Sequence, residues 1–176
     1  MGNPPRKRRV DEQRRDADAR KSSLRPELYL ILDNVRSLHN VGSIFRTADG
    51  FAVRKIFLGG YTPSPPRPEI SKTALGAEAT VDFEAVSDAA LAVIRLKAAG
   101  VCVVAVEQAD RSSSIYDYAF PRALALVLGH ETDGVANKVI ELADACVEIP
   151  MFGVKHSHNV CVAAGIVLAE VRRQWG

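Results

Sequence analysis

The sequence lacks any apolar run long enough to cross a membrane. Its longest run, residues 160–169, has ten residues, whereas a membrane-spanning helix needs about 20. The N-terminus has no hydrophobic signal-peptide core, and Arg6 stands where a myristoylation signal has Ser or Thr. We therefore expect a cytoplasmic protein with no membrane partner.

Cysteine is also scarce. The three residues, Cys102, Cys146 and Cys161, are odd in number, far apart and set in apolar surroundings. This pattern excludes a disulfide framework, offers no zinc-binding spacing and favours buried free thiols in a reducing compartment. The two common phosphate-binding patterns, G-x-G-x-x-G and G-x-x-x-x-G-K-[ST], do not occur either.

Charge is unevenly distributed. Residues 1–25 contain nine basic and four acidic residues, a net charge of +5, so the remaining 14 basic and 17 acidic residues carry −3. A basic arm on a slightly acidic body suggests an electrostatic handle for a polyanion, although a solvated tail that aids solubility would have the same composition. We predict a flexible basic arm at residues 1–25 and one catalytic domain at residues 26–176.

The rest of the chain alternates strand-like and helix-like patterns. This alternation predicts an α/β fold in which a mostly parallel sheet carries helices on both faces. The expected strands are short apolar runs at residues 28–32, 55–58, 80–83, 101–106, 124–128 and 145–149.

Helix signals lie between several of these runs. Asp88 is placed to cap a helix that runs to Ala99, with Leu91, Ile94 and Ala98 on one face. Further helices are expected at residues 135–143 and from Val160 onward, where apolar residues recur at i, i+3, i+4 and i+7. The proline-rich residues 61–68 predict a surface loop.

Three separated stretches follow strand-like runs, where open α/β sheets bind their ligands. They are NVGSIFRTA at residues 40–48, LGHETDG at 128–134, and IPM at 149–151 followed by SHNV at 157–160. Taken singly, each has a simple structural interpretation. Asn40 could cap a helix, the glycines could form turns, and Ser157 or Asn159 could cap the last helix.

In their order and spacing, the three stretches resemble the signature motifs of the SpoU/TrmH family of RNA ribose 2′-O-methyltransferases, within the SPOUT superfamily. The resemblance covers roughly residues 28–173. It implies a SPOUT-like fold with a C-terminal trefoil knot, S-adenosyl-L-methionine as cofactor, RNA as partner and a homodimer. Transfer RNA is favoured over ribosomal RNA by analogy with the minimal members of the superfamily.

The resemblance also assigns roles to individual residues. The positions expected near the reacting centre are Asn40, Arg46, Glu131, Ser157 and Asn159, with Arg46 as the phosphate anchor and stabiliser of developing alkoxide charge. The positions expected to bind the cofactor are Leu128, Gly129, Gly134, Ile149, Met151, His158 and Val160.

One residue departs from the family pattern. His158 stands where the usual Ser-Leu-Asn motif has leucine, and all four histidines lie in or beside the three motifs. His156 and His158 lack a carboxylate or cysteine that would complete a metal site, so no metal is expected, whereas a neutral histidine could accept a proton or stack on RNA. Two other interpretations remain open: an inactive RNA-binding protein of the same fold, and a small-molecule methyltransferase or nucleotide binder.

Overall fold

The computed structural model describes residues 26–176, so the predicted basic arm at residues 1–25 lies outside the described residues. These residues form one seven-stranded sheet, in the order β3-β2-β1-β6-β4-β7-β5, in which every pair of neighbouring strands is parallel. Its strands are β1 (Leu28–Asp33), β2 (Lys55–Gly59), β3 (Asp82–Val86), β4 (Cys102–Val106), β5 (Ser113–Ser114), β6 (Leu124–Leu128) and β7 (Ala145–Glu148). The predicted fold class is therefore confirmed.

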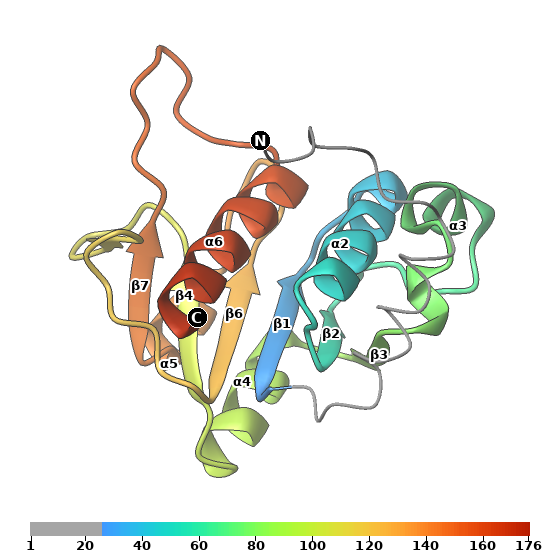
Figure 1. Cartoon of the computed structure of the whole chain (residues 1–176), viewed down its shortest axis with the longest axis horizontal. Coiled ribbons are helices and arrows are strands. Elements are labelled where there is room, and N and C mark those ends of the chain that lie inside the picture. The colour runs from blue at the N-terminus through green and yellow to red at the C-terminus, as the bar shows by residue number, and fades with distance from the viewer. Residues whose placement is uncertain (1–25) are drawn as a thin grey trace, which may run out of the picture.

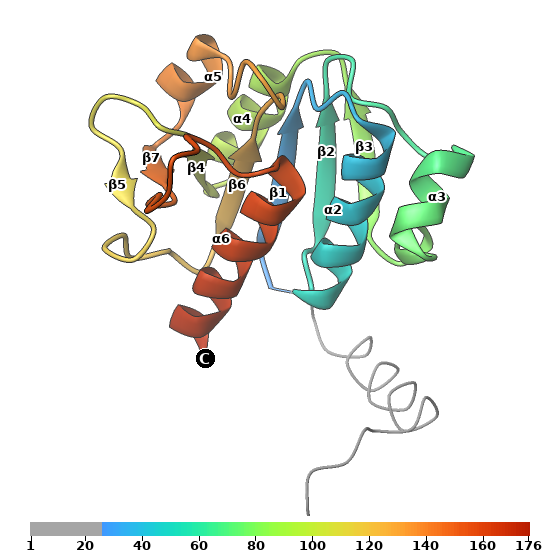
Figure 2. The ribbon, with the colours of Figure 1, turned by 90° about the horizontal axis from the view of Figure 1, so that it is seen from above.

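Helices cover both faces of the sheet (Figures 1 and 2). One face packs against α2, α3 and α6, and the other packs against α4 and α5. The helices are α2 (Leu38–Gly50), α3 (Pro68–Ala74), α4 (Ala89–Ala98), α5 (Asn137–Leu142) and α6 (Val160–Trp175), with a 3-10 turn, η1 (Ala77–Ala79), after α3. No helix among residues 26–176 is long and apolar enough to span a membrane.

The central strand β6 shows why continuous apolar runs build this sheet. All five of its residues are buried. Leu124, Leu126 and Leu128 enter the core under α2 and α6, whereas Ala125 and Val127 enter the core under α4 and α5. A strand covered on both faces needs apolar residues at every position, because successive side chains point to opposite faces.

Five of the six predicted strands lie within one residue of the observed bounds, but the third was wrong. The prediction placed a strand at residues 80–83, whereas β3 begins at Asp82. Thr80 instead ends η1, because its backbone N–H and that of Val81 both donate to the Ala77 carbonyl. The two-residue strand β5 was not predicted.

The helix α4 starts after Asp88 as predicted, with the Asp88 carboxylate accepting from the Ala90 N–H at 2.9 Å. The predicted face was wrong, because Leu91, Ile94 and Ala98 are exposed. The buried face consists of Ala89, Ala92, Val93 and Leu96. The first turn of α4 packs closely on β2, because a Cβ added to Gly59 would lie only 2.8 Å from the Ala89 Cα. This close approach favours small residues at both positions.

Three smaller predictions also need correction. Pro68 begins α3 instead of ending a loop, as the proline's fixed φ and missing N–H permit at a first helical position. The predicted helix at 135–143 is shorter, spanning Asn137–Leu142. The three thiols are free but only half-buried.

Candidate active site

The second and third motifs meet at the carboxyl ends of three neighbouring strands, β6, β4 and β7. A cavity of about 230 Å³ lies there. It is lined by all seven predicted cofactor residues and by Glu131 and Ser157. It is also lined by two of the histidines that the sequence analysis considered, His130 and His156, and by residues to which no role was assigned: Val106, Glu107, Gln108, Thr132, Asp133, Glu148 and Ala163. The structure thus brings nine of the twelve predicted site residues to one cavity.

The loop after β6 is a closed turn made by two glycines. The His130 and Gly134 backbones donate to each other's carbonyls, both at 3.0 Å. Gly134 has a φ of +70°, and a Cβ on Gly129 would lie 2.1 Å from the Gly134 carbonyl carbon. The turn therefore needs glycine at both positions, one for backbone conformation and the other for space.

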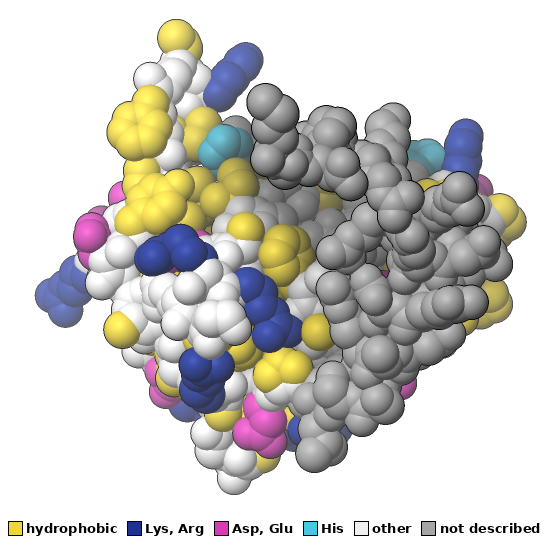
Figure 3. All heavy atoms as spheres, viewed as in Figure 1, with side chains coloured by type: hydrophobic (Ala, Val, Ile, Leu, Met, Phe, Trp, Pro, Cys, Tyr) yellow, Lys and Arg dark blue, Asp and Glu magenta, His cyan; other side chains and the backbone are white. Residues whose placement is uncertain are grey.

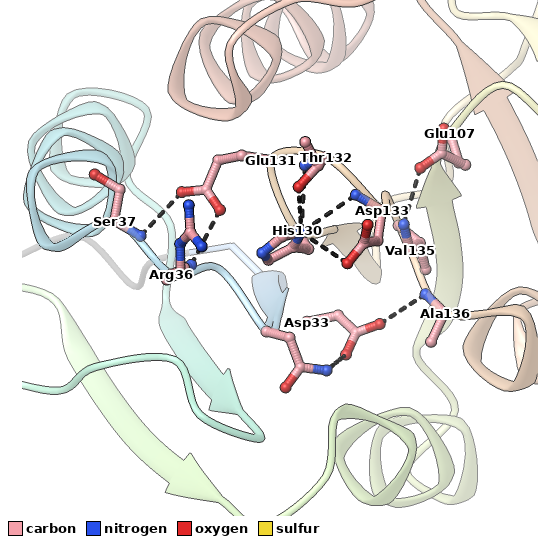
Figure 4. A network of polar contacts seen from close by, with 11 residues as sticks. Asp33, Arg36, Ser37, Glu107, His130, Glu131, Thr132, Asp133, Val135 and Ala136 are labelled. Atoms are coloured by element: carbon pink, nitrogen blue, oxygen red, sulfur yellow. Dashed lines mark hydrogen bonds and ion pairs between the residues drawn. The ribbon is translucent and has the colours of Figure 1, made fainter.

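Two carboxylates from other strands hold the end of this loop (Figure 4). Glu107, directly after β4, accepts from the Val135 N–H at 2.9 Å. Asp33, at the end of β1, accepts from the Ala136 N–H at 2.9 Å. These bonds position the loop against the sheet, and neither residue was predicted from the sequence.

The Glu131 carboxylate crosses from this loop to the start of α2 (Figure 4). It accepts from the backbone N–H groups of Ser37 at 2.9 Å and Arg36 at 3.1 Å, and from Asn40 Nδ2 at 2.8 Å. Burial alone would raise the pKa of Glu131, but these hydrogen bonds outweigh burial and hold the pKa below its ordinary value. Glu131 is thus an ionised carboxylate at the positive end of a helix, with its oxygens already occupied.

Asn40 does not cap α2 as the simple interpretation would have it. Ser37 is the N-cap, and its hydroxyl accepts from the Asn40 N–H. The Asn40 side chain instead joins the other two motifs, donating to Glu131 and accepting from Asn159 Nδ2 at 3.2 Å. Asn40 therefore links one residue from each of the other two motifs.

Asn159 completes this chain of hydrogen bonds. It caps α6, where its Oδ1 accepts from the Cys161 N–H at 2.9 Å and from the Cys161 thiol. Because Oδ1 is taken, the amide group of Asn159 faces Asn40. Each residue in this chain donates to the next: Cys161 to Asn159, Asn159 to Asn40, and Asn40 to the Glu131 carboxylate.

Arg46 stands apart from this cavity. Its side chain is exposed on α2 and has no hydrogen-bond or ion-pair partner within residues 26–176. Six residues separate it from Asn40, which puts it about 9 Å further along the helix axis and on a different side of α2. Three predicted site residues, Arg46, Asn40 and Asn159, do not line the cavity. Asn40 and Asn159 belong to the chain of hydrogen bonds that ends at Glu131, whereas Arg46 does not.

The loop between β7 and α6 forms the outer wall of the cavity. Its residues His156, Ser157 and His158 line the cavity, while Phe152 and Val154 are 94% and 92% exposed. The loop projects from the molecule, and hydrophobic side chains gather on it in Figure 3. In residues 26–176 no group of three or more His, Cys, Asp or Glu side chains is arranged to hold a metal ion.

His130 contacts both the cavity and a neighbouring loop. Its Nδ1 accepts from the backbone N–H groups of Thr132 at 3.3 Å and Asp133 at 3.2 Å. The same nitrogen lies 3.2 Å from an Asp133 carboxylate oxygen. Its ring also meets the ring of Tyr61 edge-on, with 6.2 Å between centroids, so His130 is held firmly beside the second motif.

The sheet is open and parallel, and loops at the carboxyl ends of its strands form a pocket. This arrangement is typical of ligand-binding proteins of the α/β class. The model of the SpoU rRNA Methylase family matches residues 27–169, and the chain belongs to that family. The family relation confirms the predicted SpoU/TrmH resemblance and implies the SPOUT fold, while the threading of the C-terminal knot stays a prediction.

Individual relatives show the same relation. The chain is 37% identical over 149 residues to a 23S rRNA (guanosine-2′-O-)-methyltransferase from Neisseria meningitidis, covering 85% of this chain and 59% of the relative. It resembles the crystal structure of the Aquifex aeolicus TrmH/SpoU tRNA modifying enzyme with a TM-score of 0.81 and 27% identity, covering 93% and 83% of the two chains.

A third relative is known with its cofactor. The AdoMet-bound rRNA methyltransferase from Sinorhizobium meliloti superposes with a TM-score of 0.78 at 31% identity, covering 85% of this chain and 57% of that one. The chain spans less than two thirds of the length of the first curated relatives that it matches.

Proposed function

We propose that the protein transfers a methyl group from S-adenosyl-L-methionine to a ribose 2′-hydroxyl of structured RNA. The observation that supports this best is the chain of hydrogen bonds from Asn159 through Asn40 to Glu131. It joins the three motifs beside a cavity. If the motif residues served only as helix caps and turns, they would not need to contact one another. Family membership adds to this, because the Neisseria relative is named for guanosine 2′-O-methylation.

The cavity fits the proposed cofactor. Leu128, Ile149, Met151 and Val160 provide apolar surface, and the loops after β6 and β7 offer backbone polar groups, a combination typical of cofactor sites. When bound, S-adenosyl-L-methionine would supply a methyl group on a positively charged sulfur. The Sinorhizobium relative has been crystallised with this cofactor.

The remaining chemistry falls to the protein's own side chains. Glu131 positions Asn40 and Asn159 and is poorly suited to act as a base, because three donors occupy its oxygens and its pKa is lowered. Arg46 keeps its proton in protein settings, so its role is to anchor an RNA phosphate and stabilise developing negative charge on the ribose oxygen. This leaves proton removal to a histidine of the cavity wall or to solvent.

The proposed function is tested by mapping 2′-O-methyl groups. RNA from a host that lacks this gene is incubated with the purified protein, with and without the cofactor. We expect new 2′-O-methylation only when both are present, at one or a few positions. The relatives include enzymes named for rRNA and for tRNA, so the position also tests our preference for tRNA.

Two outcomes would favour the other interpretations. RNA that is bound without being methylated would indicate an inactive RNA-binding protein. Cofactor turnover that depends on a small molecule and is indifferent to RNA would indicate a small-molecule methyltransferase. The linked residues Asn40, Glu131 and Asn159 argue against the first, and the +5 charge of residues 1–25 argues against the second.

We also propose that the protein works as a homodimer. Arg46 is exposed and outside its own cavity, and Phe152 and Val154 leave nearly all of their apolar surface exposed beside the third motif. A twofold pairing could cover such surface and bring Arg46 toward the partner's cavity. We expect light scattering at micromolar concentration to give about twice the 19.1 kDa of one chain. A stable monomer with full activity would contradict this proposal.

Deletion of residues 1–25 should separate RNA capture from cofactor binding. The deletion removes a charge of +5 and spares every motif residue. RNA affinity should fall and its dependence on salt should become flatter, because fewer counterions are released when fewer phosphates are neutralised. Filter binding at several salt concentrations measures both. Identical affinity and salt slope for the two proteins would reduce the arm to a solvated tail.

A further inference from the structure

The cavity beside the three motifs is lined by acidic residues without basic ones. Glu107, Glu131, Asp133 and Glu148 line it, and no lysine or arginine of residues 26–176 does. Its remaining titratable side chains are histidines. The lining is therefore net negative at neutral pH wherever those histidines are neutral.

Carboxylates elsewhere in the described residues are often paired with a base. Glu84 contacts Lys55 and Arg95, Glu170 contacts Arg173, Asp88 contacts Lys138 and Asp144 contacts Lys97. By contrast, Glu107, Glu131 and Glu148 form no ion pair within residues 26–176, and only Asp133 meets a histidine, His130. The absence of a compensating base is thus a feature of the cavity.

Neutral donors hold Glu107 and Glu148 in place. Glu107 accepts from the N–H groups of Val135 and Gln108, and Glu148 accepts from the Ser112 hydroxyl at 2.5 Å. These bonds fix both side chains at the ends of β4 and β7 without cancelling their charge. Glu131 differs, because its oxygens are turned to α2 and Asn40.

The fields of the two glutamates overlap at Cys146, which lies on β7 next to β4. Its thiol donates to the Glu107 carbonyl at 3.4 Å. Burial raises the pKa of Cys146, and the charges of Glu107 and Glu148 raise it further. Glu107 and Glu148 both line the cavity, so a positive charge bound between them would interact with both carboxylates at once.

We propose that Glu107 and Glu148 make the cavity select its cofactor by charge, an inference that rests on the proposed function. S-adenosyl-L-methionine carries a net positive charge, whereas its demethylated product, S-adenosyl-L-homocysteine, is neutral overall. The carboxylates favour the cationic form, and the affinity gained from them is lost when the methyl group leaves. Charge selection thus makes the product bind less tightly than the substrate, so a new cofactor molecule can displace it.

This selection has a cost in the chemical step. Carboxylates that stabilise the sulfonium before reaction stabilise it less in the transition state, where its charge is already decreasing. We expect the two glutamates to improve discrimination between substrate and product at the expense of some rate. Removing one of them should increase product inhibition, because the substrate would lose affinity while the neutral product would not.

Calorimetry on the full chain tests the proposal with three ligands. These are S-adenosyl-L-methionine, S-adenosyl-L-homocysteine and sinefungin, in which a protonated amine replaces the sulfonium. In the unaltered protein both cationic ligands should bind more tightly than the neutral product. In Glu148→Gln, which keeps an acceptor for Ser112, this preference should fall by about threefold to tenfold while affinity for the neutral product changes little. Glu141→Gln, at an exposed position on α5 outside the cavity, is the matched control and should leave the preference unchanged.

Salt dependence provides a second measurement that needs no variant. Raising the salt concentration should weaken binding of the two cationic ligands more than binding of the neutral product. An equal preference in the unaltered protein and Glu148→Gln, with equal salt dependence for all ligands, would overturn charge selection while leaving cofactor binding intact. Failure of all three ligands to bind would overturn the proposed function itself.

Discussion

Arg46→Lys should lower the rate of methyl transfer by about 100-fold while leaving cofactor affinity almost unchanged. The substitution keeps one positive charge but removes the planar guanidinium, whose two parallel donors can hold a phosphate or a developing alkoxide. Loss of a group that stabilises transition-state charge commonly costs 100-fold or more. Cofactor affinity should persist because Arg46 does not line the cavity. Single-turnover methylation and calorimetry measure the two quantities separately.

Arg54→Lys is the matched control for this experiment. Arg54 is also exposed, and its contact with Glu27, at 3.8 Å, lies at the opposite end of the sheet from the cavity. It should retain normal activity. If Arg46→Lys is also close to normal, catalysis must depend on another group, and the histidines of the cavity wall become the next residues to replace.

Glu131→Gln should impair both stability and activity. Three donors converge on the carboxylate, but a glutamine offers a single oxygen, so its NH2 group must face at least one of these donors. Because these donors are exposed or only partly buried, losing one of the bonds should lower the free energy of unfolding by about 1 kcal/mol. Methyl transfer should fall at least about tenfold, because Asn40 and Asn159 lose their fixed positions. Urea denaturation and single-turnover methylation measure these effects.

The pH dependence of stability tests the same bond set. Because the pKa of Glu131 is lowered in the folded state, its stabilising contribution is present above the ordinary pKa of glutamate, about 4.3, and is lost as the pH falls through the folded value. The stability difference between the unaltered protein and Glu131→Gln should therefore be largest near neutral pH and shrink in acid. A difference that is constant from about pH 7 to pH 3 would mean that the carboxylate charge is not responsible. Glu141→Gln again serves as a control.

Much of the fold could be predicted from the sequence because its signals are local. A strand buried on both faces is a continuous apolar run, and β1, β4 and β6 are such runs. The error in α4 has a non-local cause. Both sides of this helix are apolar, and the choice between them depends on the close approach of Ala89 to Gly59.

The candidate site was predicted in part for similar reasons. The motifs named nine residues that line the cavity, but the partner of Asn40 is 91 residues away, so an asparagine before a helical pattern suggested only a cap. Asp33, Glu107 and Glu148 were missed, although each is the last residue of a buried strand or the residue that follows one. Acidic side chains at the ends of parallel strands are a signal that could have indicated them.

The hydrogen bond between Asn40 and Asn159 also sets when the site can form during protein synthesis. These residues are 119 positions apart, and Asn159 begins α6. A growing chain could therefore fold β1, β2 and α2 while its reaction centre is still open on one side. Closing such a long segment carries an entropic cost, and the packing of α6 against α2 and the sheet helps to offset it. In the newly made protein the candidate site would therefore be completed late, once α6 has formed.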